Sequence, residues 1–428
     1  MNRRALPILI AVVATLPGLF LRLAGLHLAP PAAAVVTGGA IVGASFLLLW
    51  ACDAAQTEIS QALALAFVAL IAVLTEYSID MYFTWQAGKH PGSGYAHYAV
   101  ANMTGANRLL IGVAWGAIAV LYWLRFHRPV RLEKERRTEL LFLGLATAYA
   151  FLIPLKGTLA WYDGLVFLAL YLTYIGIASR RCCAECEPEG PAELLVRLPR
   201  TKRRLAILGL FLFSGFIILA DSAPFCEGLI GTGRVFRISE FVLVQWLAPL
   251  ASEAPEFVVA LMFAWRGQAG LALGSLLSAK LNQWTLLVGM IPGAFALSSG
   301  TLAHPIPMDG FQMHEILLTA AQSLLGIVLL AGLRLSIGGG LLLTGLFFGQ
   351  FLLPPLVEAA PGAVFGLKPD QIHPVFSFLY LAAAAALFLP RPARVMALVR
   401  RPKTPVIAPP CPPVEAENDL HSAHCSTC

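Results

Sequence analysis

The sequence predicts an all-α polytopic membrane protein with about twelve transmembrane helices, and three observations lead to this fold class. Only 13% of the 428 residues are charged and 58% are hydrophobic, with a mean hydropathy of +0.74, whereas soluble proteins carry about 25% charged residues. Apolar windows of the roughly 20 residues that cross a bilayer recur along the whole chain. One pattern of polar residues occurs once in each half, which indicates an internal repeat.

Twelve apolar windows are long enough to cross a bilayer as helices. The first follows Arg3 and Arg4 in the manner of a signal peptide. Its apolar stretch is longer than a signal sequence and has no clear cleavage site, so we predict a retained helix. The windows are 5–26, 31–52, 57–86, 97–125, 139–155, 158–178, 204–222, 237–265, 270–298, 312–334, 337–356 and 373–390.

The net charge of +6 gathers in four basic segments, at Arg3 and Arg4, 124–137, 180–204 and 391–403. If the first window starts in the cytoplasm and each window crosses once, all four segments lie on the cytoplasmic side, as the positive-inside rule requires. We therefore expect a multi-pass protein of the cell inner (plasma) membrane with cytoplasmic N- and C-termini. The charge indicates topology and gives no reason to expect nucleic-acid binding.

A basic, cysteine-containing loop divides the chain into two membrane halves. Two segments rich in proline or glycine, 27–31 and 223–236, predict turns. The expected organisation is a first half at 1–178 with a repeat at about 57–125, a cytoplasmic loop at 179–203, a second half at 204–390 with a repeat at about 237–298, and a disordered cytoplasmic tail at 391–428.

The two repeats align without gaps around Glu76 and Glu256. The matched pairs are Phe83 with Phe263, Trp85 with Trp265 and, after a seven-residue insertion in the first copy, Asn107 with Lys280 and Gly116 with Gly289. The predicted topology makes the Glu76 helix run outward and the Glu256 helix run inward. The repeats are therefore inverted, an architecture that places a transporter's substrate site near the midplane where the repeats meet.

Six charged residues lie well inside apolar windows: Glu76, Asp80, Arg108, Glu253, Glu256 and Lys280. At roughly 3 kcal/mol each on the insertion scale, they would together cost about 18 kcal/mol if unpaired, more than the net stability of about 5–15 kcal/mol of a typical protein. They must pair, neutralise or face water, as in an ion site or a proton relay. The alternative is that the acids only lock helices together through the two basic residues.

The acids come in pairs that share a helix face. Glu76 and Asp80 are four residues apart, and Glu253 and Glu256 are three apart. Clustered carboxylates attract a cation and can carry protons. Pro255 removes a backbone hydrogen bond, so we predict a helix break that frees carbonyl groups beside Glu256.

These residues carry a resemblance to a known family. The stretch Ile238–Val242, then Ala251–Glu256, then Ala272–Ser275 resembles the α-repeat of the cation/calcium exchanger superfamily, whose pattern is I-S-x-x-V, G-T-S-x-P-E and A-L-G-N followed by G-S-N. The first half matches it with Ala72–Glu76, Ala99–Asn102 and Gly105–Asn107. The resemblance covers about half of the chain and implies a ten-helix core of two inverted-topology repeats, with windows 5–26 and 373–390 as two extra helices.

The resemblance also implies the site residues. Glu76 and Glu256 match the paired glutamates that bind cations in this family, and Asn102 matches the asparagine of A-L-G-N in a supporting role. Gln283 stands where a polar ligand is expected, and Lys280 replaces the asparagine of G-S-N. The ion-binding set is then Glu76, Glu256, Asp80, Glu253, Asn102 and Gln283, with Arg108 and Lys280 as compensating charges in the place of sodium.

The expected function is secondary active cation antiport by alternating access, with exchange against protons favoured. The expected partners are the bilayer and a transported cation, which is calcium, sodium, potassium or the proton. We expect no enzyme and no cofactor, because the sequence has no nucleophile–base set, P-loop or dinucleotide fingerprint. The sequence does not indicate an oligomeric state.

Cysteine and histidine residues near the loop and the tail leave a second function open. Cys182, Cys183 and Cys186, with His424, Cys425 and Cys428, have spacings that could hold zinc or a softer metal. The simpler reading is reduced, unpaired thiols in the cytoplasm. If they bind metal, the alternative function is a membrane protein that no longer transports and acts as a metal sensor or scaffold.

Overall fold

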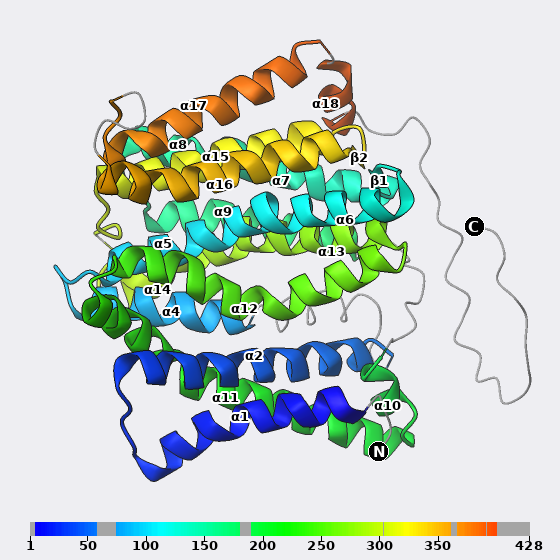
Figure 1. Ribbon diagram of the computed structural model, residues 1–428, viewed down its shortest axis with the longest axis vertical. Coiled ribbons are helices and arrows are strands. Elements are labelled where there is room, and N and C mark those ends of the chain that lie inside the picture. The colour runs from blue at the N-terminus through cyan, green and yellow to red at the C-terminus, as the bar shows by residue number, and fades with distance from the viewer. Residues whose placement is uncertain are drawn as a thin grey trace, which may run out of the picture.

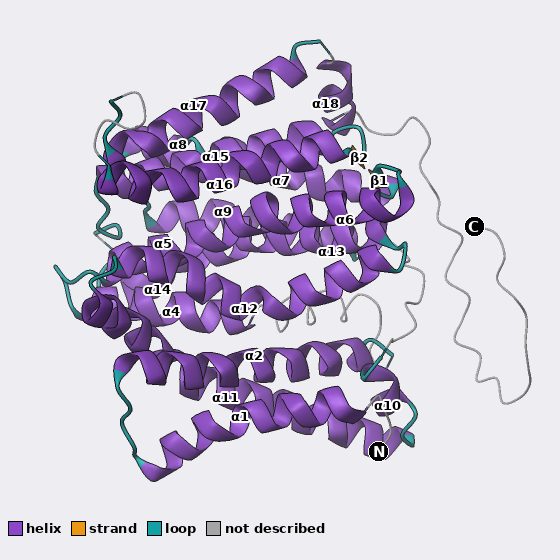
Figure 2. Ribbon diagram, in the orientation of Figure 1, coloured by secondary structure: helices purple, strands orange, loops and turns teal. Residues whose placement is uncertain are grey.

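The protein is almost entirely helical, as Figure 2 shows, in a computed structural model that describes residues 5–57, 74–179, 190–302, 304–360, 366–390 and 392–399. Among these residues, ten helical stretches are long and apolar enough to cross a bilayer by length and composition. This confirms the predicted class of an all-α polytopic membrane protein. Each predicted window overlaps a helix, although residues 58–73 of window 57–86 lie outside the described part of the chain.

The first half contains ten helices or helical turns and one short strand among its described residues. In chain order they are α1 (Ala5–Ala24), α2 (Pro30–Ala55), α4 (Leu74–Lys89), the continuous stretch α5 (Tyr95–Leu109), η1 (Leu110–Trp115) and α6 (Gly116–Phe126), then β1 (Val130–Arg131), η2 (Lys134–Arg136), α7 (Arg137–Ala150), α8 (Leu152–Lys156) and α9 (Trp161–Ala178).

The second half follows the same plan after a short helix in the loop. Its elements are α10 (Ala192–Val196), α11 (Arg200–Phe236), α12 (Glu240–Trp265), the continuous stretch α13 (Ala269–Asn282), η3 (Gln283–Leu287) and α14 (Val288–Ser299), then α15 (Gly310–Leu330), β2 (Arg334–Leu335), α16 (Ile337–Ala359), α17 (Pro369–Phe388) and α18 (Pro392–Val399).

A two-stranded antiparallel ribbon marks one end of the bundle. It pairs β1 with β2, so that Val130 faces Leu335 and Arg131 faces Arg334. We call this the ribbon end, and we call the other end, where residues 90–94 join α4 to α5, the α4–α5 end. Because β1 precedes α7 and β2 follows α15, these two helices run in opposite directions through the bundle.

The packing of two glycines agrees with inverted repeats. Gly116 of α6 lies against α16, where a Cβ atom would overlap the side chain of Thr344. Its predicted equivalent, Gly289 of α14, lies against α9, where a Cβ would come within 3.2 Å of Phe167 Cβ. Each glycine thus lets its helix approach a helix of the opposite half. The same alignment also places the two π-helical turns, η1 and η3, at equivalent positions.

Three helices form a layer beside the rest of the bundle. Figure 1 shows α1, α2 and α11 along one edge of the molecule and α17 along the other, with the remaining long helices between them. The helices α2 and α11 pack closely, because a Cβ at Gly228 would lie 2.8 Å from the backbone nitrogen of Ala34 and one at Gly231 would lie 2.5 Å from Pro30 Cβ. Small residues commonly allow such contacts between membrane helices.

These contacts also explain an incorrect prediction. The segment 223–236 is not a turn, because α11 continues through Pro224 to Phe236 as one helix of 37 residues. Its glycines allow contact with α2, and they do not end the helix. The predicted loop 179–203 likewise contains α10, and the start of the predicted disordered tail forms α18, while residues 180–189 and 400–428 lie outside the described residues.

The predicted helix break at Pro255 is also wrong, since α12 continues through both Pro249 and Pro255. The backbone irregularity lies instead in the two π-helical turns, at Leu110–Trp115 and Gln283–Leu287. Such turns occur often at functional sites, because they change the register of the side chains that follow.

One glycine at the contact between α5 and α12 provides a stability test. A Cβ at Gly105 would overlap the backbone oxygen of Gln245, which cannot rotate away. We expect Gly105→Ala to destabilise the protein by about 3 kcal/mol, at the upper end of overpacking costs. Thermal melting of the purified protein in detergent would measure it. Gly144→Ala, which has open space around the new Cβ, is the control, and equal melting temperatures for the two variants would contradict this account of the contact.

Candidate ion-binding site

Three carboxylates from two helices meet inside the bundle. Glu76 and Asp80 come from α4, and Glu253 comes from α12; their exposed fractions are 1%, 0% and 4%. Glu76 interacts electrostatically with both of the other acids. The α4 helix therefore brings two acids and α12 brings one to the same interior region, and the two halves of the chain together form one cluster.

Two amides hold these acids from the helices that carry the π turns. The Asn102 side chain donates from Nδ2 to Asp80 Oδ1 at 2.7 Å, and Gln283 donates from Nε2 to Glu253 Oε1 at 2.6 Å. Asn102 belongs to the first half and Gln283 to the second. Each half thus supplies one amide that orients one carboxylate of its own half.

Several buried oxygen atoms of this cluster have no hydrogen-bond donor among the described residues. They are both carboxylate oxygens of Glu76, Oδ2 of Asp80, Oδ1 of Asn102 and Oε1 of Gln283. Buried polar atoms normally have a partner, and carboxylate and amide oxygens are the ligands that hard cations such as calcium prefer. The arrangement can therefore coordinate a cation or bind protons.

Glu256 lies to one side of this cluster. It is half-buried and interacts electrostatically with Glu253 and with Asp53 of α2, close to the thiol of Cys52. The sequence predicted Glu76 and Glu256 as the central pair, but Glu253 is the neighbour of Glu76. The acids instead form a row from Asp80 through Glu76, Glu253 and Glu256 toward α2.

Lys280 lies beside this row and is fully buried. Its ammonium donates to Asn107 Oδ1 at 2.6 Å and to the Asn107 backbone oxygen at 3.3 Å, and it lies 4.5 Å from the centroid of the Trp284 ring. Asn107 and Lys280 are equivalent positions of the two repeats. Two equivalent positions that touch must lie near the pseudo-twofold axis, so this bond marks the centre of the repeat pair.

Arg108 was predicted to compensate the acid cluster, but it pairs elsewhere. Its Nη2 forms an ion pair with Oε2 of Glu315 on α15, and its guanidinium lies 5.2 Å from the centroid of the Trp246 ring. The same Glu315 oxygen accepts from Gln245 Nε2 at 2.5 Å, and Oε1 lies 2.6 Å from Nδ1 of His373. The sequence analysis did not select Glu315, because this residue lies near the start of the predicted window 312–334, where charged residues are common.

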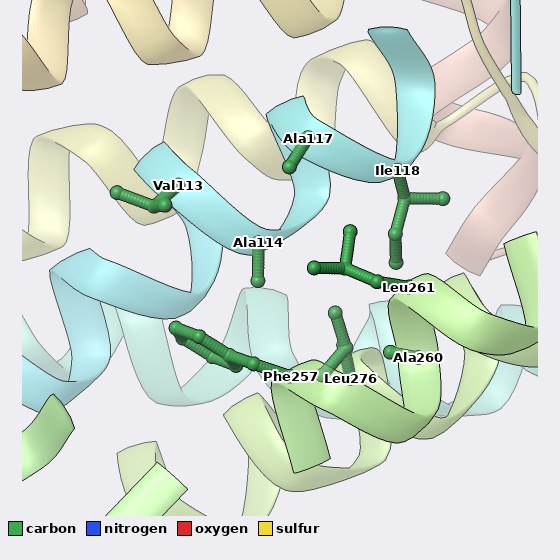
Figure 3. A pocket seen from close by; sticks show the side chains of 8 residues that line it. All are labelled: Val113, Ala114, Ala117, Ile118, Phe257, Ala260, Leu261 and Leu276. Carbon is green, nitrogen blue, oxygen red and sulfur yellow. The ribbon is translucent and has the colours of Figure 1, made fainter. Parts of the chain in front are cut away.

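A small cavity between η1, α6, α12 and α13 is apolar and does not offer an ion path. Figure 3 shows side chains from α6, α12 and α13 and from the π turn η1 lining a space of about 40 Å³, all of them hydrocarbon. Such cavities stay dry. Its lining residues are Val113, Ala114, Ala117, Ile118, Phe257, Ala260, Leu261 and Leu276.

The second predicted site falls outside the part of the chain that the structure describes. This applies to Cys182, Cys183 and Cys186 and to His424, Cys425 and Cys428, so metal binding there stays a prediction. Among the described residues, no group of three or more His, Cys, Asp or Glu side chains is arranged to hold a metal ion by itself.

The fold and the cluster define a class of protein: a multi-pass membrane protein whose two inverted repeats bring carboxylates together inside the bundle, as in secondary cation exchangers. The chain belongs to the sodium/calcium exchanger protein family, whose model matches residues 30–180 and 206–353. The match starts at α2 and ends within α16, so α1 and α17 lie outside it as the two extra helices.

Comparison with known proteins supports this assignment. The crystal structure of the H⁺/Ca²⁺ exchanger CAX is 38% identical, covers 93% of this chain and 97% of its own, and has a TM-score of 0.85. The structure of native YfkE shares the fold, with 13% identity, coverage of 87% and 99%, and a TM-score of 0.60. An uncharacterized membrane protein of Methanocaldococcus jannaschii is 25% identical over 227 residues, which are 52% of this chain and 68% of that protein.

The family membership confirms the coarse functional prediction: the protein is a cation antiporter of the sodium/calcium exchanger type. The alternative of a metal sensor or scaffold has no support from the comparisons.

Proposed function

We propose that the protein exchanges protons for a divalent cation, with calcium as the expected cargo, by alternating access to the carboxylate cluster. The observation that carries this proposal is the set of buried oxygen atoms on Glu76, Asp80, Asn102 and Gln283 that have no donor among the described residues. The similarity to the H⁺/Ca²⁺ exchanger CAX supports the choice of proton and calcium.

The charges of the cluster support proton coupling. With Arg108 paired to Glu315, one ammonium, that of Lys280, stands against the four carboxyl groups of Glu76, Asp80, Glu253 and Glu256. A net charge inside the membrane costs several kcal/mol, so the bound charge must stay nearly constant through the cycle. Two protons carry the same charge as one divalent cation. Their exchange therefore leaves the net charge of the cluster and its bound ions unchanged.

In this mechanism Glu76 and Glu253 hold the cation, and Asn102 and Gln283 add amide oxygens and keep the acids oriented. Asp80 takes part as a proton carrier beside Glu76. Glu256 passes ions or protons between the cluster and the α2 side. Lys280 supplies a fixed positive charge where other members of the family would bind a monovalent cation.

Access alternates when one group of helices moves against the other. The layer of α1, α2 and α11, which Figure 1 shows beside the rest of the bundle, is the group that we expect to move, because α2 carries Asp53 opposite Glu256. We place the protein in the plasma membrane with its ribbon end in the cytoplasm, since the basic segment 124–137 lies at that end.

Flux measurements in liposomes would test the proposal. We expect an acidic interior to drive uptake of radioactive calcium into vesicles that contain the purified protein, and we expect a sodium gradient alone to drive none. Competition by sodium, potassium and manganese would rank the cations that the site accepts. Calcium uptake that requires a sodium gradient and ignores the pH gradient would refute proton coupling.

A further inference from the structure

Two buried glutamates lie outside the carboxylate cluster, one in each half of the chain. Glu139 is near the start of α7, and Glu315 is near the start of α15. The sequence around them is similar: each is followed by aliphatic residues and, eight positions later, by a hydroxyl residue, Thr147 or Ser323. Because α7 starts at the ribbon end and α15 starts at the α4–α5 end, the two glutamates lie toward opposite ends of the molecule.

Each glutamate is linked, directly or through one arginine, to the helix of the opposite half that carries one partner of the central Asn107–Lys280 bond. Glu315 pairs with Arg108 and lies 3.4 Å from Thr104 Oγ1, so its contacts bracket Asn107 on α5. Glu139 reaches α13 through Arg136, whose Nη1 lies 2.8 Å from Glu139 Oε1 and 3.0 Å from Ser278 Oγ. Ser278 stands two residues before Lys280 in the chain.

These contacts form a line of polar residues from one end of the bundle to the other, which we call the spine. It begins at Glu315, crosses α5, passes through the bond between Asn107 and Lys280, crosses α13 and ends at Glu139. The bond in the middle lies near the pseudo-twofold axis, and the two glutamates form the two ends of the spine. Helix α5 also carries Asn102, which orients Asp80. Helix α13 leads directly into the π turn η3, which carries Gln283, the amide that orients Glu253.

The two ends of the spine differ in this structure. Glu315 accepts from Arg108 and Gln245 and contacts His373, and the side chains of its ion pair with Arg108 are 0% and 1% exposed. Glu139 accepts from Arg136 and, at 3.1 Å, from Tyr174. Each glutamate has one oxygen without a hydrogen-bond donor among the described residues, Oε2 of Glu139 and Oε1 of Glu315, but the Arg136 side chain is 22% exposed. The Glu315 end is closed and the Glu139 end is looser.

We propose that Glu139 and Glu315 are paired positioning residues that act as clamps, each holding the opposite repeat closed at its own end of the molecule. In the state described here the Glu315 clamp is closed and the Glu139 clamp is partly released. Inverted repeats exchange conformations when access alternates, so in the other state the Glu139 clamp closes and the Glu315 clamp releases. This inference rests on the alternating-access cycle proposed above.

Two native cysteines can report which end opens. Cys226 on α11 is buried near Asp80, toward the α4–α5 end. Cys52 on α2 is buried near Glu256, toward the ribbon end. After replacement of the six other cysteines by serine, the rate at which a small, membrane-impermeant thiol reagent alkylates each residue in purified protein measures access from its end. Labelling needs no transported ion, so its outcome is separate from the outcome of the flux assay.

Opposite effects are expected from the two clamps. Glu315→Gln should raise the rate of Cys226 alkylation about tenfold, the change expected for loss of a charge-assisted hydrogen bond, and should not raise that of Cys52. Glu139→Gln should lower the Cys226 rate, because it weakens only the state that is open at the α4–α5 end. If Glu315→Gln misfolds because Arg108 is left unpaired, the double variant Arg108→Gln, Glu315→Gln removes both charges and should give the same increase.

An ion pair away from the spine, whose carboxylate is buried, provides the control. Asp163 on α9 is buried at the α4–α5 end and pairs with Lys156, so Asp163→Asn breaks a comparable pair at the same end. We expect it to leave both alkylation rates unchanged. The proposal is overturned if Asp163→Asn raises Cys226 labelling as much as Glu315→Gln does, if the two glutamate variants shift it in the same direction, or if neither shifts it.

Discussion

Glu76→Gln is expected to abolish calcium exchange and to leave the protein folded. The carboxylate of Glu76 is the most central acid of the cluster, and both of its oxygens lack a donor among the described residues. Two unit charges about 4 Å apart interact by about 4 kcal/mol at an effective dielectric constant of 20. Loss of that attraction lowers cation affinity by more than about a hundredfold. Proton-driven uptake of radioactive calcium in liposomes would measure the loss.

The folding of this variant is expected to be intact for a physical reason. Glutamine keeps the size of the side chain and removes a buried charge that costs several kcal/mol inside a membrane, so the melting temperature should not fall. Glu358→Gln, on an exposed position of α16, changes a carboxyl group away from the cluster and should keep full exchange. Full exchange by Glu76→Gln, or an equal loss in Glu358→Gln, would remove Glu76 from the mechanism.

Much of the fold could be predicted because hydropathy and repeat spacing are local properties of the sequence. The window 237–265 became α12, and the gapped alignment that matched Asn107 with Lys280 also matched the two π turns. The long helix α11 was missed because its glycines and Pro224 suggest turns. Only the packed structure shows that the glycines serve the contact with α2.

The carboxylate cluster was predicted in its membership but not in its pairing. Helical spacing put Glu253 and Glu256 on one face, yet it could not decide which of them turns toward Glu76. The partner of Arg108 was unpredictable for a related reason, since Glu315 lies 207 positions away in the chain. The contacts that decide such pairings depend on how helices from different halves are arranged.

Lys280→Asn is expected to make calcium exchange depend on sodium. The Lys280 ammonium is fully buried, is held by Asn107 and interacts electrostatically with Glu76. Asparagine removes one positive charge from a site where net charge is costly, and it leaves space and an amide oxygen near the pseudo-twofold axis. A monovalent cation from solution can then fill the place of the ammonium. We expect exchange by this variant to fall at least tenfold without sodium and to recover when sodium is added on both sides of the vesicle membrane.

Two further substitutions at the same position separate charge from shape. Lys280→Arg keeps the positive charge and should remain insensitive to sodium, even if its larger head slows exchange. Lys280→Met keeps much of the length but has neither the charge nor an oxygen ligand, so it should lose exchange without recovering in sodium. If Lys280→Asn exchanges calcium at the original rate without sodium, the buried ammonium serves packing alone. The choice between proton and sodium coupling would then depend on the carboxylates themselves, because the cluster would keep a constant net charge through the cycle without the Lys280 ammonium.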